Sequence, residues 1–115
     1  MAGYFEIRTR SDGQFMFTLK DDDHQIILSS EAYTTKAACV NGIESVKKNA
    51  PDDDRYRRTT TPDGKFGFAL AAPNGQVVGG GEHYENDAAR DDGIQSVKTN
   101  APDAEVKDLA DFKPL

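Results

Sequence analysis

The chain of 115 residues contains one cysteine, two histidines and no tryptophan. Because Cys39 is the only cysteine, no intramolecular disulfide forms, which fits a reducing compartment. No apolar run approaches the roughly twenty residues of a membrane span, and the first residues lack the pattern of a signal peptide. These absences predict a cytoplasmic protein that does not associate with a membrane.

The composition is that of a small, well-solvated globular protein. Charged residues make up 30% of the chain and the formal net charge is -6, which argues against non-specific binding to nucleic acid or to an anionic membrane. Hydrophobic residues account for 37%, among them six phenylalanines and four tyrosines. This apolar content suffices for one modest core, so we expect one compact domain or two units too small to be stable apart.

The chain is internally duplicated. Residues 11–52 align with residues 62–103 at a constant offset of 51, without a gap. Identical pairs include Gly13/Gly64, Phe15/Phe66, Phe17/Phe68, Leu19/Leu70, Tyr33/Tyr84, Gly42/Gly93 and Ile43/Ile94, and both copies contain Asn-Ala-Pro-Asp at 49–52 and 100–103. We therefore divide a single domain into a first repeat at 4–54, a second repeat at 55–109 and a C-terminal tail at 110–115.

Each repeat is predicted to form three strands, a helix and a further strand. Asp-Gly pairs at 12–13 and 63–64 mark hairpin turns between alternating apolar residues. Thr35 and Asn86 are expected to cap the helix N-termini, while Asn49 and Asn100 are expected in the left-handed conformation at the C-termini. Residues 55–61 are expected to be an extended segment that joins the repeats. The predicted core comprises Phe15, Phe17, Leu19, Ile26, Leu28, Ile43, Val46 and their counterparts in the second repeat.

The repeat resembles the YegP-like family of small bacterial and archaeal proteins. The residues that carry the resemblance are the Gly-Ile-x-Ser-Val-Lys segments at 42–47 and 93–98 and the Asn-Ala-Pro-Asp segments. The resemblance implies an α+β fold, in which two tandem β-β-β-α-β repeats form one antiparallel sheet. It also implies two helices packed on one face, C-terminal strands exchanged between repeats, and a monomer with internal pseudo-twofold symmetry. The family is one of unknown function, so it supplies no catalytic residues.

Two groups of residues are candidate binding sites. Arg55, Tyr56, Arg57 and Arg58 form the one basic cluster with an aromatic, which on a strand would contact phosphates and stack a base. Against this interpretation stand the net charge and the acidic residues 52–54, which are able to pair with the arginines. The second group is the duplicated helix end, with Asn49, Asp52, Asn100 and Asp103, whose residue types are also explained by helix termination.

Other features have structural interpretations that outweigh the functional ones. Gly42 and Gly93 indicate close packing rather than the floor of a ligand site, and residues 79–81 indicate a bulge or strand end rather than a phosphate loop. The acidic turn at 21–24 lacks the ligand spacing of a calcium loop. Cys39 falls on the buried arc of its helix. We therefore predict no catalytic, metal-binding or cofactor-binding residues and no cofactor.

The sequence leaves the function unknown, with three classes open. The leading one is a small, soluble, non-catalytic binding or protein-interaction module that presents a sheet face or an edge strand to a protein partner. The second is an RNA- or phosphate-binding protein that uses residues 55–58. The third is a small-ligand carrier or an enzyme with a site between the repeats, which a pocket lined by polar groups from both copies would support.

Overall fold

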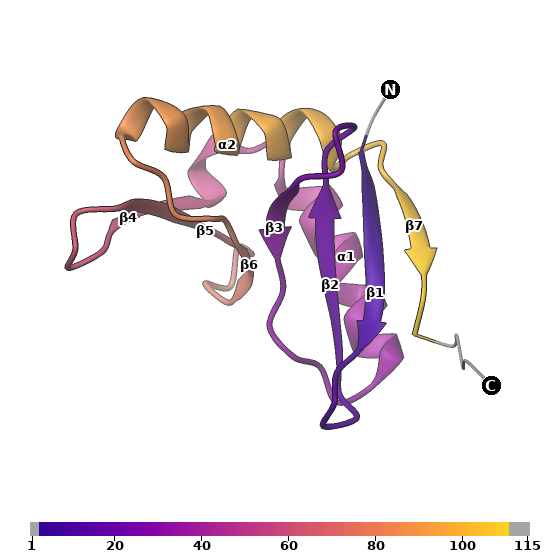
Figure 1. Ribbon diagram of the computed structural model, residues 1–115. Coiled ribbons are helices and arrows are strands. Elements are labelled where there is room, and N and C mark those ends of the chain that lie inside the picture. The colour runs from indigo at the N-terminus through magenta and orange to yellow at the C-terminus, as the bar shows by residue number, and fades with distance from the viewer. Residues whose placement is uncertain (1–2, 111–115) are drawn as a thin grey trace.

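The computed structural model describes residues 3–110, so most of the predicted tail at 110–115 lies outside the described residues. The fold is α+β, with seven strands and two α-helices (Figure 1). The elements are β1 (Tyr4–Thr9), β2 (Phe15–Lys20), β3 (Ile26–Ser29), α1 (Lys36–Asn49), the 3-10 helix η1 (Asp53–Arg55), β4 (Tyr56–Thr60), β5 (Phe66–Ala71), β6 (Val77–Gly80), α2 (Asp87–Asn100) and β7 (Glu105–Asp108). Within residues 3–110, neither helix has the length and apolar character needed to cross a membrane.

The strands form one mixed sheet in the order β4-β5-β6-β3-β2-β1-β7. The expectation of a purely antiparallel sheet is wrong at one edge, because β7 runs parallel to β1. Hairpins impose antiparallel pairing on their strands, whereas β7 follows α2 and reaches the far edge of the sheet by a crossover, which permits parallel pairing. The last strand of the second repeat thus pairs with the first strand of the first repeat.

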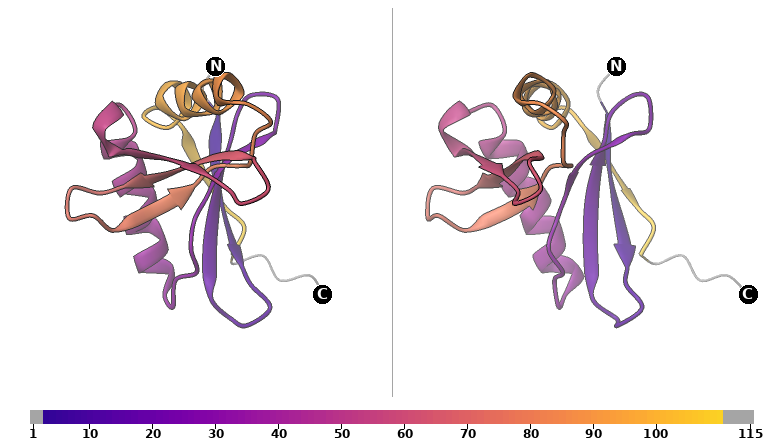
Figure 2. Two further views of the ribbon diagram at one scale, coloured as in Figure 1. Left: turned by 90° about the vertical axis from the view of Figure 1, so that its left-hand side faces the viewer. Right: turned by 60° about the vertical axis from the view of Figure 1, so that its left-hand side comes forward.

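The two halves of the sheet meet at a single pair of residues, Ser29 of β3 and Gly80 of β6. These residues are repeat counterparts, 51 positions apart, and their strands are antiparallel. A pseudo-twofold axis therefore passes between them. The half-sheets run in clearly different directions on either side of this junction (Figure 2).

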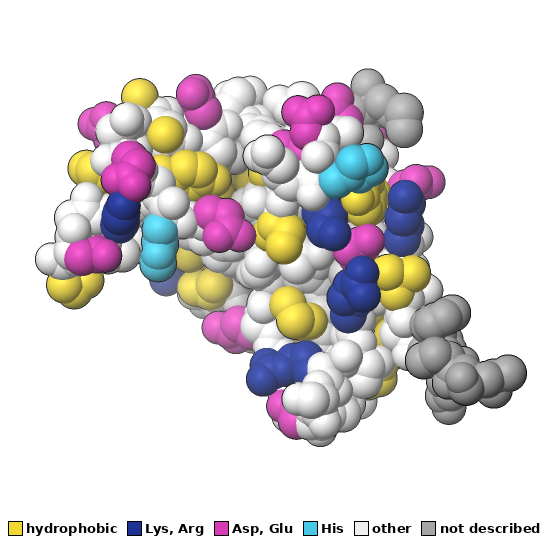
Figure 3. All heavy atoms as spheres, viewed as in Figure 1, with side chains coloured by type: hydrophobic (Ala, Val, Ile, Leu, Met, Phe, Trp, Pro, Cys, Tyr) yellow, Lys and Arg dark blue, Asp and Glu magenta, His cyan; other side chains and the backbone are white. Residues whose placement is uncertain are grey.

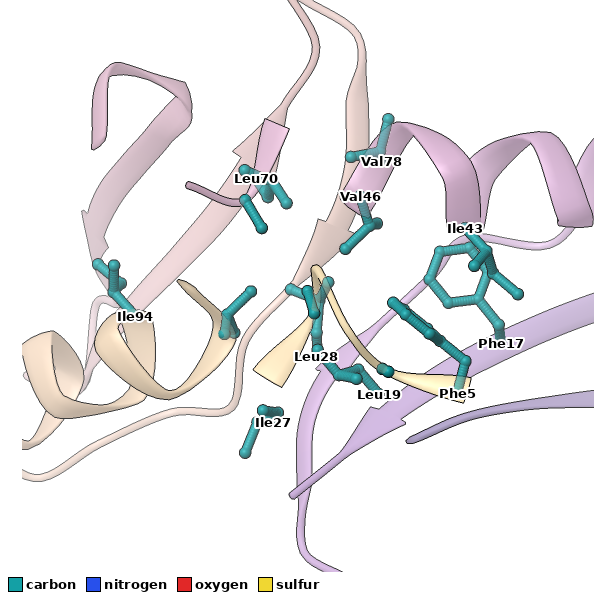
Figure 4. Close-up of a cluster of buried hydrophobic side chains, with 14 of the residues drawn as sticks. Phe5, Phe17, Leu19, Ile27, Leu28, Ile43, Val46, Leu70, Val78 and Ile94 are labelled. Carbon is teal, nitrogen blue, oxygen red and sulfur yellow. The ribbon is translucent and has the colours of Figure 1, made fainter. Parts of the chain in front are cut away.

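One side chain fills the core beside this axis. Leu28 is fully buried and lies in the middle of the hydrophobic cluster, with Leu70 and Ile94 on one side and Phe17 on the other (Figure 4). Its counterpart is Gly79, where a Cβ atom would lie 2.9 Å from Leu28 Cδ2. Two leucines would not fit at this point, so glycine in the second repeat makes room for leucine from the first.

Gly81 supports the prediction that residues 79–81 form a strand end rather than a phosphate loop. A Cβ atom on Gly81 would overlap the ring of Phe68, so this glycine lets the ring lie against the backbone. The segment ends strand β6 and is followed by an irregular stretch before α2 begins at Asp87. It does not lead directly into a helix N-terminus, as a phosphate-binding loop does.

Most of the predicted core is confirmed, but Phe15 and Phe66 at the starts of β2 and β5 are only partly buried, and the third strand differs from the prediction. Ile26 is wrong as a core residue, because its side chain is 40% exposed whereas that of Ile27 is 6% exposed. The cause is a β-bulge: Leu19 pairs with Leu28 and Lys20 pairs with Ile26, which leaves Ile27 as an extra residue on β3. The second repeat has the same irregularity and likewise buries Val78.

Helix α1 contacts β2, β5 and β6, whereas α2 contacts β3 and β5. Each helix therefore packs on strands of both repeats, and the buried side chains form one hydrophobic cluster. The predicted N-caps are confirmed: Thr35 Oγ1 accepts a hydrogen bond from the Ala38 amide and Asn86 Oδ1 accepts one from the Ala89 amide.

The prediction that Asn49 and Asn100 adopt the left-handed conformation is wrong. Both are the last residues of their helices, and the caps that follow them also have negative φ angles, -55° at Ala50. Each asparagine donates a hydrogen bond of 2.8 Å from Nδ2 to the carbonyl oxygen of Ser45 or Ser96, one turn earlier. This local side-chain bond holds the asparagine in helical geometry.

Candidate functional site

The three arginines of the basic cluster all have partners in the folded chain. Arg55 belongs to η1 rather than to a strand, and its Nε lies 3.4 Å from Asp52 Oδ2. Arg57 Nη2 donates a hydrogen bond of 3.1 Å to the Gly75 carbonyl. Arg58 pairs with acidic side chains on two elements. The guanidinium groups are thus engaged within the molecule.

Tyr56 lies in the core rather than on the surface. Its side chain is 6% exposed, its ring packs edge-on against Phe68, and its hydroxyl donates a hydrogen bond of 2.7 Å to the Ala50 carbonyl. Burial raises the pKa of the Tyr56 phenol well above its ordinary value. Because the ring packs against other core residues, it is not presented to a nucleotide base.

Arg58 belongs to a group of ion pairs that we call the flank cluster, formed by Asp53, Arg58, Asp91 and Lys98. Arg58 Nε lies 3.2 Å from Asp91 Oδ1, and Lys98 Nζ lies 2.7 Å from Asp53 Oδ1. Hydrogen bonds from these cations hold the pKa of both aspartates below the ordinary value. The cluster closes the flank between β4 and α2 with charged groups.

The flank cluster has an apolar equivalent in the first repeat. Arg58 and Asp91 correspond to Ile7 and Val40, and Ile7 is 1% exposed on β1, whose outer edge is covered by β7. No strand covers the outer edge of β4 within residues 3–110. The uncovered flank thus carries ion pairs where the covered flank carries apolar side chains. Charged residues on an edge strand oppose pairing with another strand.

The polar side chains at the duplicated helix ends form hydrogen bonds within the molecule. Asn49 is 6% exposed, and Asp52 Oδ1 caps η1 by accepting a hydrogen bond of 3.0 Å from the Asp54 amide. Asn100 Oδ1 accepts one of 2.8 Å from the Gly3 amide. Asp103 lies exposed in the turn before β7. The fold does not bring the four candidate residues Asn49, Asp52, Asn100 and Asp103 together into one site.

A cleft of about 220 Å³ lies between α1 of the first repeat and the β5–β6 hairpin of the second, and we call it the inter-repeat cleft. One wall comes from α1 and the segment before it, and the other comes from the hairpin. The lining residues are Tyr33, Ala38, Asn41, Gly42, Ser45, Ala72, Asn74, Gln76 and Val78. Sequence reasoning proposed a site between the repeats as one alternative but did not identify these residues, apart from Gly42.

Gly42 and Tyr33 have linked positions in this cleft. A Cβ atom on Gly42 would overlap the Tyr33 hydroxyl and lie 2.9 Å from Tyr33 Cζ. The tyrosine ring stacks on Phe17 at a centroid distance of 6.2 Å, and burial raises the pKa of its hydroxyl. The structure therefore supports close packing at Gly42 and also places it in the lining of a cleft.

The lining residues offer unused hydrogen-bonding groups. Among residues 3–110, no hydrogen bond forms to the side-chain amides of Asn41 and Gln76 or to the Tyr33 hydroxyl. Ser45 Oγ accepts a bond from Asn49 Nδ2 and retains its proton for donation. No charged side chain lines the cleft. The site is therefore neutral, with donors and acceptors on both walls.

The sequence contains one indication of this cleft, the identity of several lining residues with their counterparts in the other repeat. Five of the nine lining residues are identical to their counterparts 51 positions away: Tyr33/Tyr84, Ala38/Ala89, Gly42/Gly93, Ser45/Ser96 and Gln76/Gln25. Sequence reasoning assigned Gly42 to packing and did not connect the other positions. The connection needs the tertiary structure, because the two walls lie in different repeats.

The side chains most able to act as a nucleophile or to bind a metal have structural roles, Cys39 in the core and Asp21 in a turn. Cys39 is fully buried, as predicted, and burial raises the pKa of its thiol to about 11. Within residues 3–110, one group of three metal-ligating side chains occurs, the carboxylates of residues 21–23. Asp21 Oδ1 accepts hydrogen bonds from the Asp23 and Gln25 amides, which makes it a turn-forming residue.

Arg90, which intrudes on the apolar arc of α2, is accommodated by its neighbours. Its guanidinium lies 5.4 Å from the centroid of the Phe66 ring, and its Nε lies 3.4 Å from Asp91 Oδ1. On the face shown in Figure 3, acidic and basic side chains are interspersed. This face therefore offers no large surface of one charge for an extended polyanion.

Comparison with known proteins identifies the family. The model for "Domain of unknown function (DUF1508)" matches residues 11–56 and again residues 62–108, which supports the internal repeat. A UPF0339 protein of Bordetella pertussis is 54% identical over 108 residues, covering 94% of this chain and 96% of the relative. The UPF0339 protein YegP of Escherichia coli O157:H7 is 45% identical over 108 residues, covering 94% and 98%.

Solved structures agree with this assignment. The solution structure of YegP from E. coli, a protein of unknown function, matches with a TM-score of 0.93 at 42% identity, covering 98% of this chain and 97% of that one. A UPF0339 protein from Shewanella oneidensis matches with a TM-score of 0.90 at 42% identity, covering 96% and 93%. The chain belongs to the DUF1508 family of uncharacterised UPF0339 proteins, which includes YegP.

Proposed function

We propose that this protein is a non-catalytic binding module and that its ligand site is the inter-repeat cleft. The observation that carries the proposal is the cleft itself, a concave site lined from both repeats by neutral polar groups, of which the side-chain amides of Asn41 and Gln76 have no hydrogen-bond partner among residues 3–110. Concave sites with a few convergent polar groups are the usual locations for small ligands. The buried Cys39 thiol, with its raised pKa, is a poor nucleophile, which supports a binding role over a catalytic one.

Two other roles receive less support. Arg57 and Arg58 on the outermost strand β4 oppose the addition of a partner strand, which weakens an edge-strand interaction with another protein. For RNA or phosphate to bind residues 55–58, the arginines would have to leave their present partners. These are Asp52 for Arg55, Gly75 for Arg57, and Asp53 and Asp91 for Arg58. The RNA role would be favoured if the wild-type protein retained single-stranded RNA at low salt and a variant with the three arginines replaced by alanine did not.

The experiment for the cleft uses matched variants of the two repeats. Gln76 lines the cleft, and its counterpart Gln25 occupies the same place in the other repeat. Purified protein is incubated with a small-molecule extract of bacterial cells, washed by ultrafiltration and analysed by mass spectrometry. We expect wild type and Gln25→Trp to retain a compound that Gln76→Trp loses.

Two results would contradict the proposal. Either the wild type retains no compound above the level of an unrelated protein, or Gln76→Trp retains the same compound as the wild type. Because both glutamines are exposed side chains in turn-flanking positions, folding of the two tryptophan variants is compared by circular dichroism before the assay.

A further inference from the structure

We propose that the inter-repeat cleft takes a neutral polyhydroxyl ligand, a sugar or a polyol; the proposal rests on the binding function inferred above. The cleft is lined by the side chains of Asn41 and Ser45 on one wall and of Asn74 and Gln76 on the other. A carboxamide both donates and accepts hydrogen bonds, and so does a hydroxyl group. A ligand that carries hydroxyls on several sides matches such walls without needing a particular protonation state.

The charge of the cleft selects against ionic ligands. None of its nine lining residues is charged. A ligand with a carboxylate, phosphate or ammonium group would lose water on entering and would find no opposite charge among the lining side chains, which is unfavourable. A neutral ligand avoids this cost.

The positions 51 residues away from the lining residues show that neutrality is a property of this cleft rather than of the repeat. Asn41, Ala72 and Asn74 correspond to Asp92, Asp21 and Asp23, while Tyr, Gly, Ser and Gln are kept at the other polar or close-packed positions. The same backbone framework therefore tolerates either an amide or a carboxylate at the positions of Asn41 and Asn74. The two asparagines are, on this account, the residues that determine ligand charge.

The dimensions favour a compact ligand. The cleft volume of about 220 Å³ is below the roughly 300–1,000 Å³ of pockets for drug-sized molecules. The apolar groups in the lining are small side chains, Ala38, Ala72 and Val78. They suit the carbon–hydrogen face of a sugar ring, while its hydroxyls reach the amides.

The test uses three sugars of nearly the same shape and different charge: glucose, glucosamine and glucuronate. Each is titrated into isotopically labelled protein, and the backbone amide signals of residues 38–45 and 72–78 are followed by NMR. In the wild type we expect glucose to shift these signals with an affinity at least about tenfold higher than either charged sugar, equivalent to ~1.4 kcal/mol. In the double variant Asn41→Asp/Asn74→Asp, we expect the preference to change to glucosamine by a similar factor.

The outcomes separate this proposal from the proposed function. A charged sugar that binds the wild-type cleft as well as glucose would overturn the inference about ligand charge and leave a binding function intact. An absence of shifts with glucose and with myo-inositol at tens of millimolar would overturn the polyhydroxyl assignment, while the extract experiment still decides whether the cleft binds anything. A double variant that keeps the preference for glucose would show that Asn41 and Asn74 do not set the selectivity.

Discussion

At the scale of single residues, Gly42 and Gly93 occupy helix interiors, where glycine costs roughly 1 kcal/mol relative to alanine. In both helices a tyrosine hydroxyl fills the space that a Cβ atom would need. The loss in helix propensity is therefore offset by the packing of Tyr33 and Tyr84 on the helix backbone. The same contact occurs in both repeats, so it is a common feature of the repeat fold.

We predict that Gly42→Ala destabilises the protein, although alanine is the better helix former. Overpacking of this kind costs about 1–3 kcal/mol. Alanine gains about 1 kcal/mol in helix propensity over glycine. We expect the overpacking cost to be the larger of the two. Urea unfolding measures the difference. The double variant Tyr33→Phe/Gly42→Ala removes the hydroxyl and should recover part of the loss; an unchanged or higher stability for Gly42→Ala alone would contradict the packing account.

Glu6 gives a second prediction at this scale. Its carboxylate lies 2.8 Å from Lys20 Nζ and 3.5 Å from Arg8 Nη2, with 11% of the side chain exposed. The Lys20 ammonium beside it lowers the pKa of Glu6 below its ordinary 4.5, despite the opposing effect of burial. Since the pKa is lower in the folded state, the stabilisation is present above about pH 4.5 and is lost as the pH falls through the folded-state value.

Glu6→Gln should therefore be less stable than wild type at pH 7 by more than the about 0–1 kcal/mol of an exposed ion pair. The difference should shrink as the pH falls from 7 through the folded-state pKa of Glu6, where the wild-type carboxyl becomes protonated. Thermal unfolding of both proteins across this pH range is the measurement. A difference that stays constant with pH would assign the effect to something other than the charge of Glu6.

At the scale of elements, β3 and β6 are the pair on which the architecture depends. They are the inner strands of the two half-sheets, and they meet at residues related by the repeat. Leu28 on β3 fills the space that Gly79 leaves on β6. The equivalent strands are therefore not interchangeable, because only one of them carries the large side chain.

Leu28→Ala should cost about 2–5 kcal/mol, the range observed for truncating a fully buried leucine. Ile26→Ala, two residues earlier on the same strand, is the matched control and should cost well under half as much, because its side chain is 40% exposed. Chemical denaturation compares the two. Equal losses would contradict the position of the bulge in β3.

Most of the strands and turns could be predicted from the sequence. Alternating apolar residues and Asp-Gly turns located the strands, and Gly13 and Gly64 do adopt positive φ angles. The bulge that buries Ile27 could not be predicted, because two-residue periodicity alone places Ile26 and Leu28 on the same face. The parallel pairing of β7 and the helical geometry of Asn49 also depend on contacts that a local pattern does not specify.

The candidate site was less accessible to prediction. Residues 55–58 form a cluster of like charges in the sequence, but their partners Gly75 and Asp91 lie in the β5–β6 turn and in α2. The two walls of the inter-repeat cleft lie more than twenty-five residues apart. Pairing them needs the fold, although the repeated Tyr, Gly and Ser positions are visible in the sequence.

At the scale of the whole molecule, the two repeats share one hydrophobic cluster, and each helix packs on strands of both. β7 of the second repeat closes the edge of β1 in the first. Neither repeat buries its apolar face without the other, so we infer that residues 4–54 and 55–109 form one cooperative domain. The inter-repeat cleft exists only while the repeats remain together.

Urea unfolding followed by NMR at individual residues tests this claim most directly. The amide signals of Ile43 in α1 and Ile94 in α2 report on the two repeats separately. The shared core predicts that both lose native intensity at the same urea concentration, in wild type and in Leu28→Ala alike. Two separate midpoints, or a loss confined to the first repeat in the variant, would contradict the account.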